Sequence, residues 1–268
     1  MMNIFSNLFV LSLYMLLLVS CQKKVQNKKP NSESNKRWIQ LFNGKDLNDW
    51  KIKIKGYSLG DNYKNTFQVV DGVLQVNYDD YNDEFNESYG HIFYKNAYSN
   101  YKLRMQYRFI DKQIKDGAGW AERNSGVMIH SQSPESMKLG QDFPVSIEVQ
   151  LLGGLNEGEE RPTGNLCTPG THVVMMGKLI KKHCINSSSK TYYGNQWVSL
   201  EIEVHNDSLL SHTINGKKVL SYSKPVIGGE YNELPSKEGK QLKRGYISLQ
   251  SESHPVEFKN IELLELEN

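Results

Sequence analysis

Most of the chain after residue 38 alternates between apolar and polar positions with a period of two. From Leu103 to Phe109 every odd position is apolar or aromatic and every even position is polar, which predicts a strand with one buried face. The same alternation recurs over 145–151 and 198–204. No window of about a dozen residues carries a helical stripe. The pattern therefore predicts an all-β chain with only short helical turns, for instance around 133–137.

Turn signals separate the predicted strands. Asp71-Gly72 lies between FQVV and VLQV, and Asn215-Gly216 lies between SHTI and KKVLSY; both are two-residue hairpin signals. The closing segments YISLQS and VEFKNIELLEL predict two more strands, joined through 252–255 as a last hairpin. Many short strands with one polar and one apolar face predict two packed antiparallel sheets, and we expect them to form a single domain over 38–268.

The first 37 residues predict a targeting signal followed by a flexible tether. Residues 7–20 form an uncharged apolar run, too short to cross a bilayer, and the tetrapeptide LVSC that ends at Cys21 resembles a bacterial lipobox. This implies a signal peptide over 1–20, a lipid on Cys21 and a flexible tether over 21–37. No acid follows Cys21 directly, so we expect an outer-membrane anchor facing the periplasm. A cleaved secretory signal beside an incidental cysteine is the alternative.

Composition and charge exclude some partners. The 268 residues are 38% apolar and 23% charged with a net charge of +2, as in an ordinary globular protein. Six of the 32 basic residues, but one of the 30 acidic residues, precede Trp38, so the predicted domain is slightly acidic. This distribution gives no electrostatic reason for nucleic-acid binding.

Two cysteines remain once Cys21 is set aside. Cys167 and Cys184 are an even pair in an oxidising compartment, which favours a disulfide. Two free buried thiols, or a metal pair completed by His172 and His183, are the alternatives. The Cys-x-x-Cys spacing typical of structural zinc is absent from the sequence.

Three stretches concentrate polar groups beyond what a solvated sheet face needs. They hold Trp120, Arg123, Asn124 and His130; then Glu148 and Gln150 with Asp142 upstream; then Gln250, Glu252 and His254 at the last hairpin. Arginine presents a fixed fork to oxygen-rich ligands, and a carboxylate with histidines supplies acid and base. The segment 161–172 is predicted to be a long, proline-pinned loop beside a cleft. Each residue also has a structural interpretation: Glu148 on a solvated strand face, His130 hydrogen-bonded in the core, Arg123 bracing a loop, His254 in a turn.

Six segments, taken in order, resemble one bacterial family. They are LFNGKDLNDW (41–50), GHIFYK (90–95), YKLRMQYRF (101–109), RNSGVMIH (123–130), SIEVQLLGG (146–154) and GYISLQSESHPVEFKNIEL (245–263). Together they resemble the 3-keto-disaccharide hydrolase family, also described as 3-keto-glucoside 1,2-lyase/3-keto-2-hydroxy-glucal hydratase. The resemblance covers nearly everything after the tether. It implies a concanavalin A-like, glucanase-type jelly roll that holds a saccharide on the concave face of one sheet.

The substrate class that the resemblance implies suggests roles for these residues. A ketone at C3 of a glucoside acidifies the C2 proton, so a base can start β-elimination of the C1 aglycone, and water then adds back. We assign Glu148 as the base, and Arg123, helped by Gln150, as the stabiliser of the enolate oxygen. His130 or His254 would supply the acid or bind one divalent metal that polarises the ketone. Substrate contacts are expected from Trp120, Asn124, Gln150, Gln250 and Glu252.

Two other functions remain open on the same scaffold. Glucanases of this superfamily carry Glu-x-Asp-x-x-Glu on one strand, whereas this chain has Glu148, Gln150 and Gly153 at those positions. Classical glycoside hydrolysis needs a second carboxyl group, which Asp142 or Glu252 would have to supply by folding close to Glu148. A carbohydrate-binding module without catalysis is the other alternative. The oxidised saccharide and the lyase reaction are the preferred hypothesis.

Overall fold

Strands and short 3-10 turns make up the computed structural model, which describes residues 37–267. In chain order the strands are β1 (Ile39–Gln40), β2 (Trp50–Ile54), β3 (Phe67–Val70), β4 (Val73–Val76), β5 (Gly90–Tyr98), β6 (Asn100–Phe109), β7 (Asn124–Ser131), β8 (Ile147–Leu152), β9 (Asn165–Cys167), β10 (Thr171–Met175), β11 (Lys178–Ile180), β12 (Cys184–Ile185), β13 (Val198–His205), β14 (Leu209–Ile214), β15 (Lys217–Ile227), β16 (Gly245–Ser251) and β17 (Val256–Glu265). The 3-10 turns are η2 (Tyr63–Asn65), η3 (Asp79–Tyr81), η4 (Gly119–Ala121), η5 (Pro134–Ser136) and η6 (Pro235–Lys237). The helical turn expected around 133–137 is η5.

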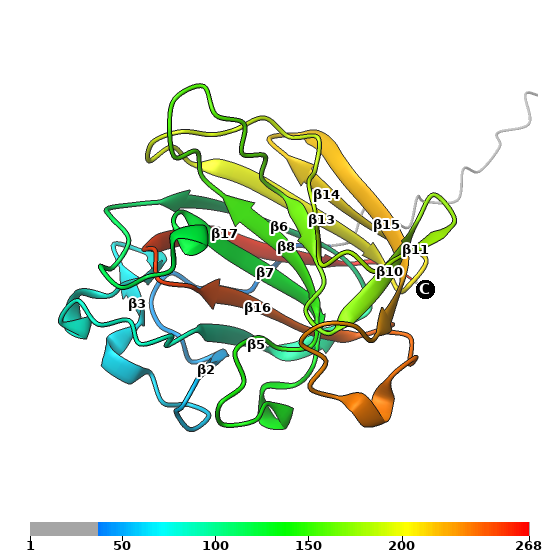
Figure 1. Ribbon diagram of the computed structural model, residues 1–268, viewed down its shortest axis with the longest axis horizontal. Helices are drawn as coiled ribbons and strands as arrows, with labels where there is room; N and C mark the ends of the chain where they lie inside the picture. The colour runs from blue at the N-terminus through cyan, green and yellow to red at the C-terminus, as the bar shows by residue number, and fades with distance from the viewer. Residues whose placement is uncertain (1–36, 268) are drawn as a thin grey trace, which may run out of the picture. The chain divides into compact units, whose positions relative to one another are not determined.

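Two antiparallel sheets face each other across the apolar core. The seven-stranded sheet has the order β12-β9-β8-β7-β16-β5-β2, and it lies in front in Figure 1. The ten-stranded sheet behind it has the order β11-β10-β15-β14-β13-β6-β17-β4-β3, with β1 paired to β17. The predicted all-β class and the two packed antiparallel sheets are confirmed.

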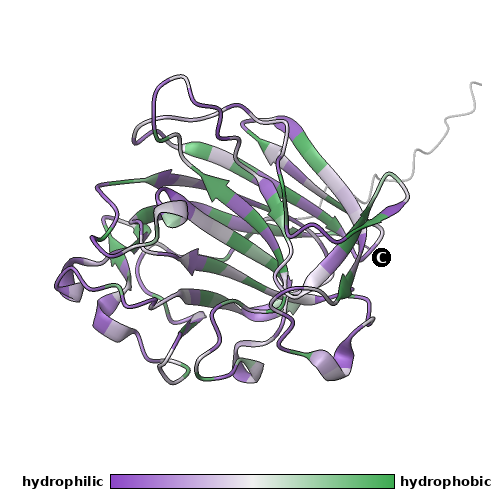
Figure 2. Cartoon of the chain, in the orientation of Figure 1, coloured by the Kyte–Doolittle hydropathy of each residue, from purple (hydrophilic) through white to green (hydrophobic). Residues whose placement is uncertain are grey.

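The alternating pattern explains why these segments are strands. Buried and half-buried positions alternate along all of β13, and the buried ones join a core supplied by both sheets. Green and purple segments alternate along many strands in Figure 2 for the same reason. Truncating one large side chain of this core to alanine costs about 2–5 kcal/mol, so each large side chain that the alternation buries matters for stability.

Both predicted tight turns are present. Asp71 and Gly72 have φ of 50° and 80° between β3 and β4, and Asn215 and Gly216 have φ of 45° and 78° between β14 and β15. Positive φ at both central residues is the geometry that the twist of a two-residue hairpin requires. Asparagine, aspartate and glycine reach this region at low energetic cost.

Two sequence-based expectations about connections are wrong. The last two strands do not form a hairpin, because β16 belongs to the seven-stranded sheet and β17 to the ten-stranded sheet. Ser253, in the crossing segment, donates its backbone N–H to the Tyr78 hydroxyl at 2.9 Å and accepts from the N–H of Ile114 at 3.1 Å. The segment 161–172 is not a continuous loop either, since β9 lies inside it and pairs with β8.

The central strand β7 is buried at all eight positions. One of its faces packs on the other sheet, and loops cover the opposite face, which is called the outer face below. A strand covered on both sides can place polar groups out of bulk water, and this is where the candidate site lies.

No helix among residues 37–267 is long and apolar enough to cross a membrane. The predicted signal peptide, Cys21 and nearly all of the predicted tether lie outside the described residues.

Candidate active site

A row of polar side chains crosses the outer face of the seven-stranded sheet. Strand register places these residues side by side: Lys53 on β2, His91 on β5, Gln250 on β16, Gly126 on β7, Gln150 on β8 and Asn165 on β9. Residues directly opposite on antiparallel strands have Cβ atoms about 4.5–5.5 Å apart, so neighbours in the row are in contact range. Sequence alternation predicted that Glu148 and Gln150 face away from the core, and they do.

A cavity of about 330 Å³ opens over this face. Its lining includes five residues predicted from the sequence: Trp120, Asn124, Glu148, Gln150 and Glu252. Gln250, which was also predicted, contacts Glu252 through its amide. Residues that sequence analysis did not single out for the site complete the walls: Phe143, Pro169, His183, Tyr231 and the Cys167–Cys184 disulfide.

Glu148 lies across the neighbouring strand because that strand has a glycine there. A Cβ on Gly126 would lie 2.6 Å from Glu148 Oε1, which is too close for any real contact. Gly126 is the register partner of Gln150, and Gln250 follows on its other side. Glycine therefore lets the Glu148 side chain lie over β7. Burial raises the pKa of Glu148 to about 8, since the charged form is removed from water.

Glu252 follows β16 and is 3% exposed. Burial first, and the negative charge of Glu148 second, raise its pKa well above the usual range. Gln250 donates its amide N–H to Glu252 Oε1 at 3.3 Å, whereas Glu252 Oε2 is buried without a hydrogen-bond partner. Neither carboxyl forms an ion pair with any lysine, arginine or histidine within residues 37–267. Two coupled carboxyls without a cation retain a proton at neutral pH.

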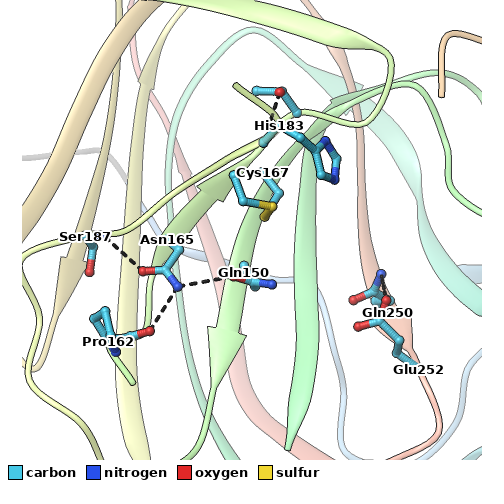
Figure 3. Close-up of a disulfide and its surroundings, with 10 residues drawn as sticks. Gln150, Pro162, Asn165, Cys167, His183, Ser187, Gln250 and Glu252 are labelled. Atoms are coloured by element: carbon cyan, nitrogen blue, oxygen red, sulfur yellow. Dashed lines mark hydrogen bonds between the residues drawn. A yellow bond between two sulfur atoms is a disulfide. The ribbon is translucent and has the colours of Figure 1, made fainter. Parts of the chain in front are cut away.

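A chain of hydrogen bonds orients the Gln150 amide (Figure 3). The backbone N–H of Ser187 donates to Asn165 Oδ1 at 2.9 Å, so Asn165 Nδ2 is the donor to Pro162 O and to Gln150 Oε1, at 3.0 and 3.2 Å. Because Oε1 of Gln150 accepts, its NH₂ group is left as a donor. Figure 3 shows this nitrogen directed away from Asn165, on the side of Gln250 and Glu252.

Arg123 and His254 come together with each other and not with Glu148. Both pack on the Phe109 ring, at 5.5 Å for the guanidinium carbon and 5.6 Å for the imidazole. Arg123 also donates to the backbone carbonyl of Gly194. Burial, and then the charge of Arg123, lower the pKa of His254 to about 4. Since Phe109 belongs to the core between the sheets, this corner lies outside the cavity, and the predicted roles of Arg123 and His254 stay predictions without geometric support.

His130 is held at a different place. Its backbone has a φ of 49°, and its Nε2 donates to the backbone carbonyl of Asn206 at 2.8 Å. Asn206 follows β13, so this bond joins the seven-stranded sheet to a turn of the other sheet. His130 borders a separate cavity of about 550 Å³. Its predicted acid role likewise stays a prediction that the geometry does not support.

Asp142 does not reach Glu148 either. Its carboxylate forms an ion pair with Lys55 at 2.8 Å and is 37% exposed. Of the two acids considered for the second carboxyl, Glu252 is the one that the fold brings to Glu148.

A group of three metal-ligand side chains was found among residues 37–267, and it borders the cavity. Cys167, His183 and Cys184 have ligand atoms within 4.8 Å of one another. The two sulfurs are joined in the disulfide that the sequence favoured, and they lack the thiolate charge that binds metals. The donor set therefore does not fit a metal in this oxidised form, and the divalent metal expected from the sequence stays a prediction.

Aromatic rings form the rim of the cavity. Trp120 and Tyr231 are 56% and 50% exposed, unusual for such large side chains, and Phe143 packs 5.9 Å from Tyr231. Tyr231 has a φ of 60° in the segment after β15. No periodic pattern marks Phe143 or Tyr231, because both lie in irregular segments that only the tertiary structure brings to the sheet.

The fold and site define an all-β jelly-roll sandwich with an acidic cavity on one sheet. The model of the 3-keto-alpha-glucoside-1,2-lyase-like domain matches residues 37–264, and the chain belongs to this family. The family assignment expected from the six motifs is therefore confirmed. No match was found among curated protein sequences.

Solved structures share the fold at low identity. A candidate glycosyl hydrolase from Parabacteroides distasonis is 20% identical, covers 86% of this chain and 100% of its own, and gives a TM-score of 0.53. A second one from the same organism is 20% identical, covers 86% and 94%, and gives 0.50. A carbohydrate-binding module from Bacillus subtilis is 11% identical, covers 72% and 86%, and gives 0.43. The two glycosyl hydrolase structures show the fold, and the family indicates a carbohydrate-related function.

Proposed function

We propose that this protein cleaves 3-keto-glucosides by β-elimination followed by hydration, a net hydrolysis. The observation that supports this proposal best is the buried pair of Glu148 and Glu252, which has no cationic partner and borders a cavity. Elimination next to a ketone needs one carboxylate as base and one proton donor. A carboxyl pair that holds a single proton supplies both.

Glu148 is the base in this proposal. Its side chain lies over Gly126, next to the Gln150 amide, and the remaining proton of the coupled pair is on Glu252 when Glu148 is ionised. The Glu148 carboxylate takes the C2 proton, and the C2–H electron pair forms the enolate between C2 and C3. A raised pKa brings the base closer to that of the carbon acid, which favours transfer. The amide NH₂ of Gln150 is the available donor to the enolate oxygen.

Glu252 is the acid. As the enolate returns its electron pair, the ketone re-forms, a C1–C2 double bond appears and the C1–O bond to the aglycone breaks. The proton of Glu252 passes to the departing oxygen. Water then adds at C1 of the 3-keto-glucal while a proton returns to C2, and both carboxyls regain their starting states. The sum is one water consumed and one glycosidic bond cleaved.

The aromatic rim fits a saccharide. The faces of sugar rings present C–H groups that pack on aromatic rings, and Trp120 and Tyr231 are exposed beside the carboxyl pair. Polar amides on the floor and rings on the rim match an amphipathic sugar.

Hydrolysis of an unoxidised glycoside is the second candidate. Glu252 supplies the second carboxyl that the strand motif lacks, and this observation favours a two-carboxylate glycosidase more than the sequence did. The keto substrate separates the two, because elimination requires a carbonyl at C3, whereas direct displacement at C1 does not.

The test compares a 3-keto-glucoside with its parent glucoside, each with and without a chelator. We expect turnover of the keto substrate alone. When that substrate carries deuterium at C2, we expect the deuterium to be lost to solvent. Glu148→Gln should lower kcat by about 1000-fold, whereas the control Glu201→Gln on β13 should leave it within twofold. Equal turnover of the parent glucoside would support the glycosidase, and binding without turnover would support a non-catalytic module. A loss on chelation would support the divalent metal.

We also propose that Cys21 carries the lipid that anchors the protein in the outer membrane facing the periplasm. The tetrapeptide LVSC and the short apolar run before it support this location. Cys21→Ser should move the protein from the membrane fraction to the soluble fraction. Unchanged fractionation of that variant would contradict the anchor.

A further inference from the structure

One buried imidazole, His91, lies in the polar row, and the proposed mechanism does not use it. His91 is fully buried on β5, and neither ring nitrogen has a hydrogen-bond partner within residues 37–267. Its neighbour Ile92 belongs to the core, so His91 faces outward on the side of the cavity. Phe143, a wall of that cavity, covers it with ring centroids 6.3 Å apart. A buried polar group left without partners in a folded protein calls for a functional explanation.

Gln250 lies beside His91, and its amide oxygen is a buried acceptor that lacks a hydrogen-bond donor. The two residues are direct register partners on β5 and β16 and share the outer face. Gln250 Oε1 is buried without a partner, whereas its Nε2 donates to Glu252 Oε1. An imidazole N–H and an amide oxygen on Cβ atoms about 5 Å apart come within hydrogen-bond distance after a side-chain rotation.

We infer that His91 is a positioning residue for the acid Glu252, acting through Gln250. The inference rests on the proposed function of Glu252. A neutral His91 donates to Gln250 Oε1 and so holds the Gln250 amide with its NH₂ toward Glu252. Oε1 of Glu252 must then accept, which leaves the acidic proton on Oε2, the oxygen without a protein partner. If the amide turned over, its oxygen would accept that proton and withhold it from the leaving group.

The surroundings keep His91 neutral. Burial, and then the positive charge of Lys53, lower its pKa to about 3. Lys53 is its register partner on β2 and donates to the carbonyls of Ile54, Tyr57 and Leu139 at 2.9, 3.0 and 3.1 Å. A neutral imidazole has one donor and one acceptor at every working pH, so its hydrogen bond does not titrate.

The other titratable groups that face Glu252 come from three segments. They are Glu148 on β8, Tyr78 after β4 and Tyr89 before β5. The two tyrosines stay neutral, because burial raises the pKa of each. A change in the titration of the pair after a substitution at His91 would therefore report on Gln250 and not on another neighbour.

The experiment combines turnover with direct titration of the two carboxyls by carbon NMR of labelled glutamate. His91→Phe should lower kcat by about 10-fold with KM within twofold, at the lower end of what outer hydrogen-bond partners contribute at known sites. The Glu252 titration should move to higher pH, because an amide oxygen then accepts from the protonated acid. His91→Gln, which keeps a donor, should restore both, and His91→Met replaces the Phe variant if that one does not fold.

A double-mutant cycle tests the route through Gln250. Gln250→Met removes the amide that His91 orients, so it should lower kcat by itself, and adding His91→Phe to it should cause no further loss. Additive losses, or a fall in kcat with an unmoved carboxyl titration, would overturn the inference. Absence of turnover in the unmodified protein would refute the proposed function instead, while the titration would still decide whether His91 controls the pair.

Discussion

Two regions with ionisable side chains lie at the two faces of the seven-stranded sheet, and they differ in the sign of their charge and in the direction of their pKa shifts. The outer face holds Glu148 and Glu252 in a cavity without a cation, and burial raises both pKa values. The corner between the sheets holds Arg123 and His254 on the Phe109 ring, and burial lowers both pKa values. Arg123 and Asn124 are consecutive in the chain, yet Asn124 borders the cavity and Arg123 does not.

The separation of Arg123 from the two carboxyls explains why the acidic cavity suits proton transfer. A guanidinium close to Glu148 would lower the pKa of that carboxyl and make it a weaker base. Keeping Arg123 behind the sheet preserves the basicity of one carboxylate and the proton of the other. The corner instead braces loops, since Arg123 bonds a backbone carbonyl and Arg161 bonds the carbonyls of Arg123 and Gly153.

After substitution of Glu148, the largest expected effect concerns the second carboxyl, Glu252. Glu252→Gln should lower kcat on the keto substrate by about 100-fold and abolish the fall of activity at high pH, because the residue that loses its proton there is gone. A pH–rate profile of both proteins measures this. An unchanged kcat would contradict the proposal that Glu148 and Glu252 act together as base and acid.

Stability should depend on pH through the same pair. A carboxyl whose folded pKa is raised contributes stability below its unfolded pKa of 4.5, and this stability is lost as pH rises through about 8. Glu148→Gln has no such loss, so we expect it to exceed the original protein in unfolding free energy by about 1–3 kcal/mol at pH 7 and to match it near pH 4. Denaturant melts at both pH values check this, and a constant difference would mean that folding does not raise the pKa of Glu148.

The glycine under Glu148 gives a third test. Gly126→Ala places a methyl group where the carboxyl lies, so the side chain must move off β7. We expect kcat to fall by about 10-fold, since a small misplacement of a catalytic group is costly. Gly140→Ala, where an added Cβ meets nothing, is the matched control. Equal kinetics for the two variants would show that the carboxyl position is not critical.

A substitution of Arg123 tests whether the corner between the sheets takes part in catalysis. Arg123→Met removes the guanidinium but keeps a long apolar chain against Phe109, so we expect a lower melting temperature and kcat within threefold. Activity and thermal unfolding are measured on the same preparation. A loss of about 100-fold in kcat with normal stability would restore the role of enolate stabiliser that the sequence suggested.

The smallest effects belong to the rim. Trp120→Ala or Tyr231→Ala should raise KM for a keto-disaccharide by about 5-fold and leave kcat unchanged, because stacking binds substrate and transition state alike. Tyr57→Ala, a stacked aromatic outside the cavity, serves as the control. A fall in kcat without a change in KM would place these rings in the chemistry.

Local patterns predicted the elements well because each depends on neighbouring residues. Alternation over 103–109 and 198–204 predicted β6 and β13, and Asp71-Gly72 and Asn215-Gly216 predicted their hairpins. The last connection was predicted wrongly, since a turn sequence such as 252–255 does not reveal which sheet the next strand joins. The pairing of β16 with β7, which no local pattern reveals, is what brings Glu252 to Glu148.

The sequence by itself determined the all-β class, the family and which polar residues face away from the core, because side-chain period and turn chemistry are local properties. It singled out Glu148, Gln150 and Glu252 without being able to pair them. Only the tertiary structure decided that Glu252 meets Glu148 while Arg123, His130 and His254 do not. The reason is physical: strand register and sheet crossings are set by packing between segments distant in the chain, and contact between catalytic groups depends on those packing choices.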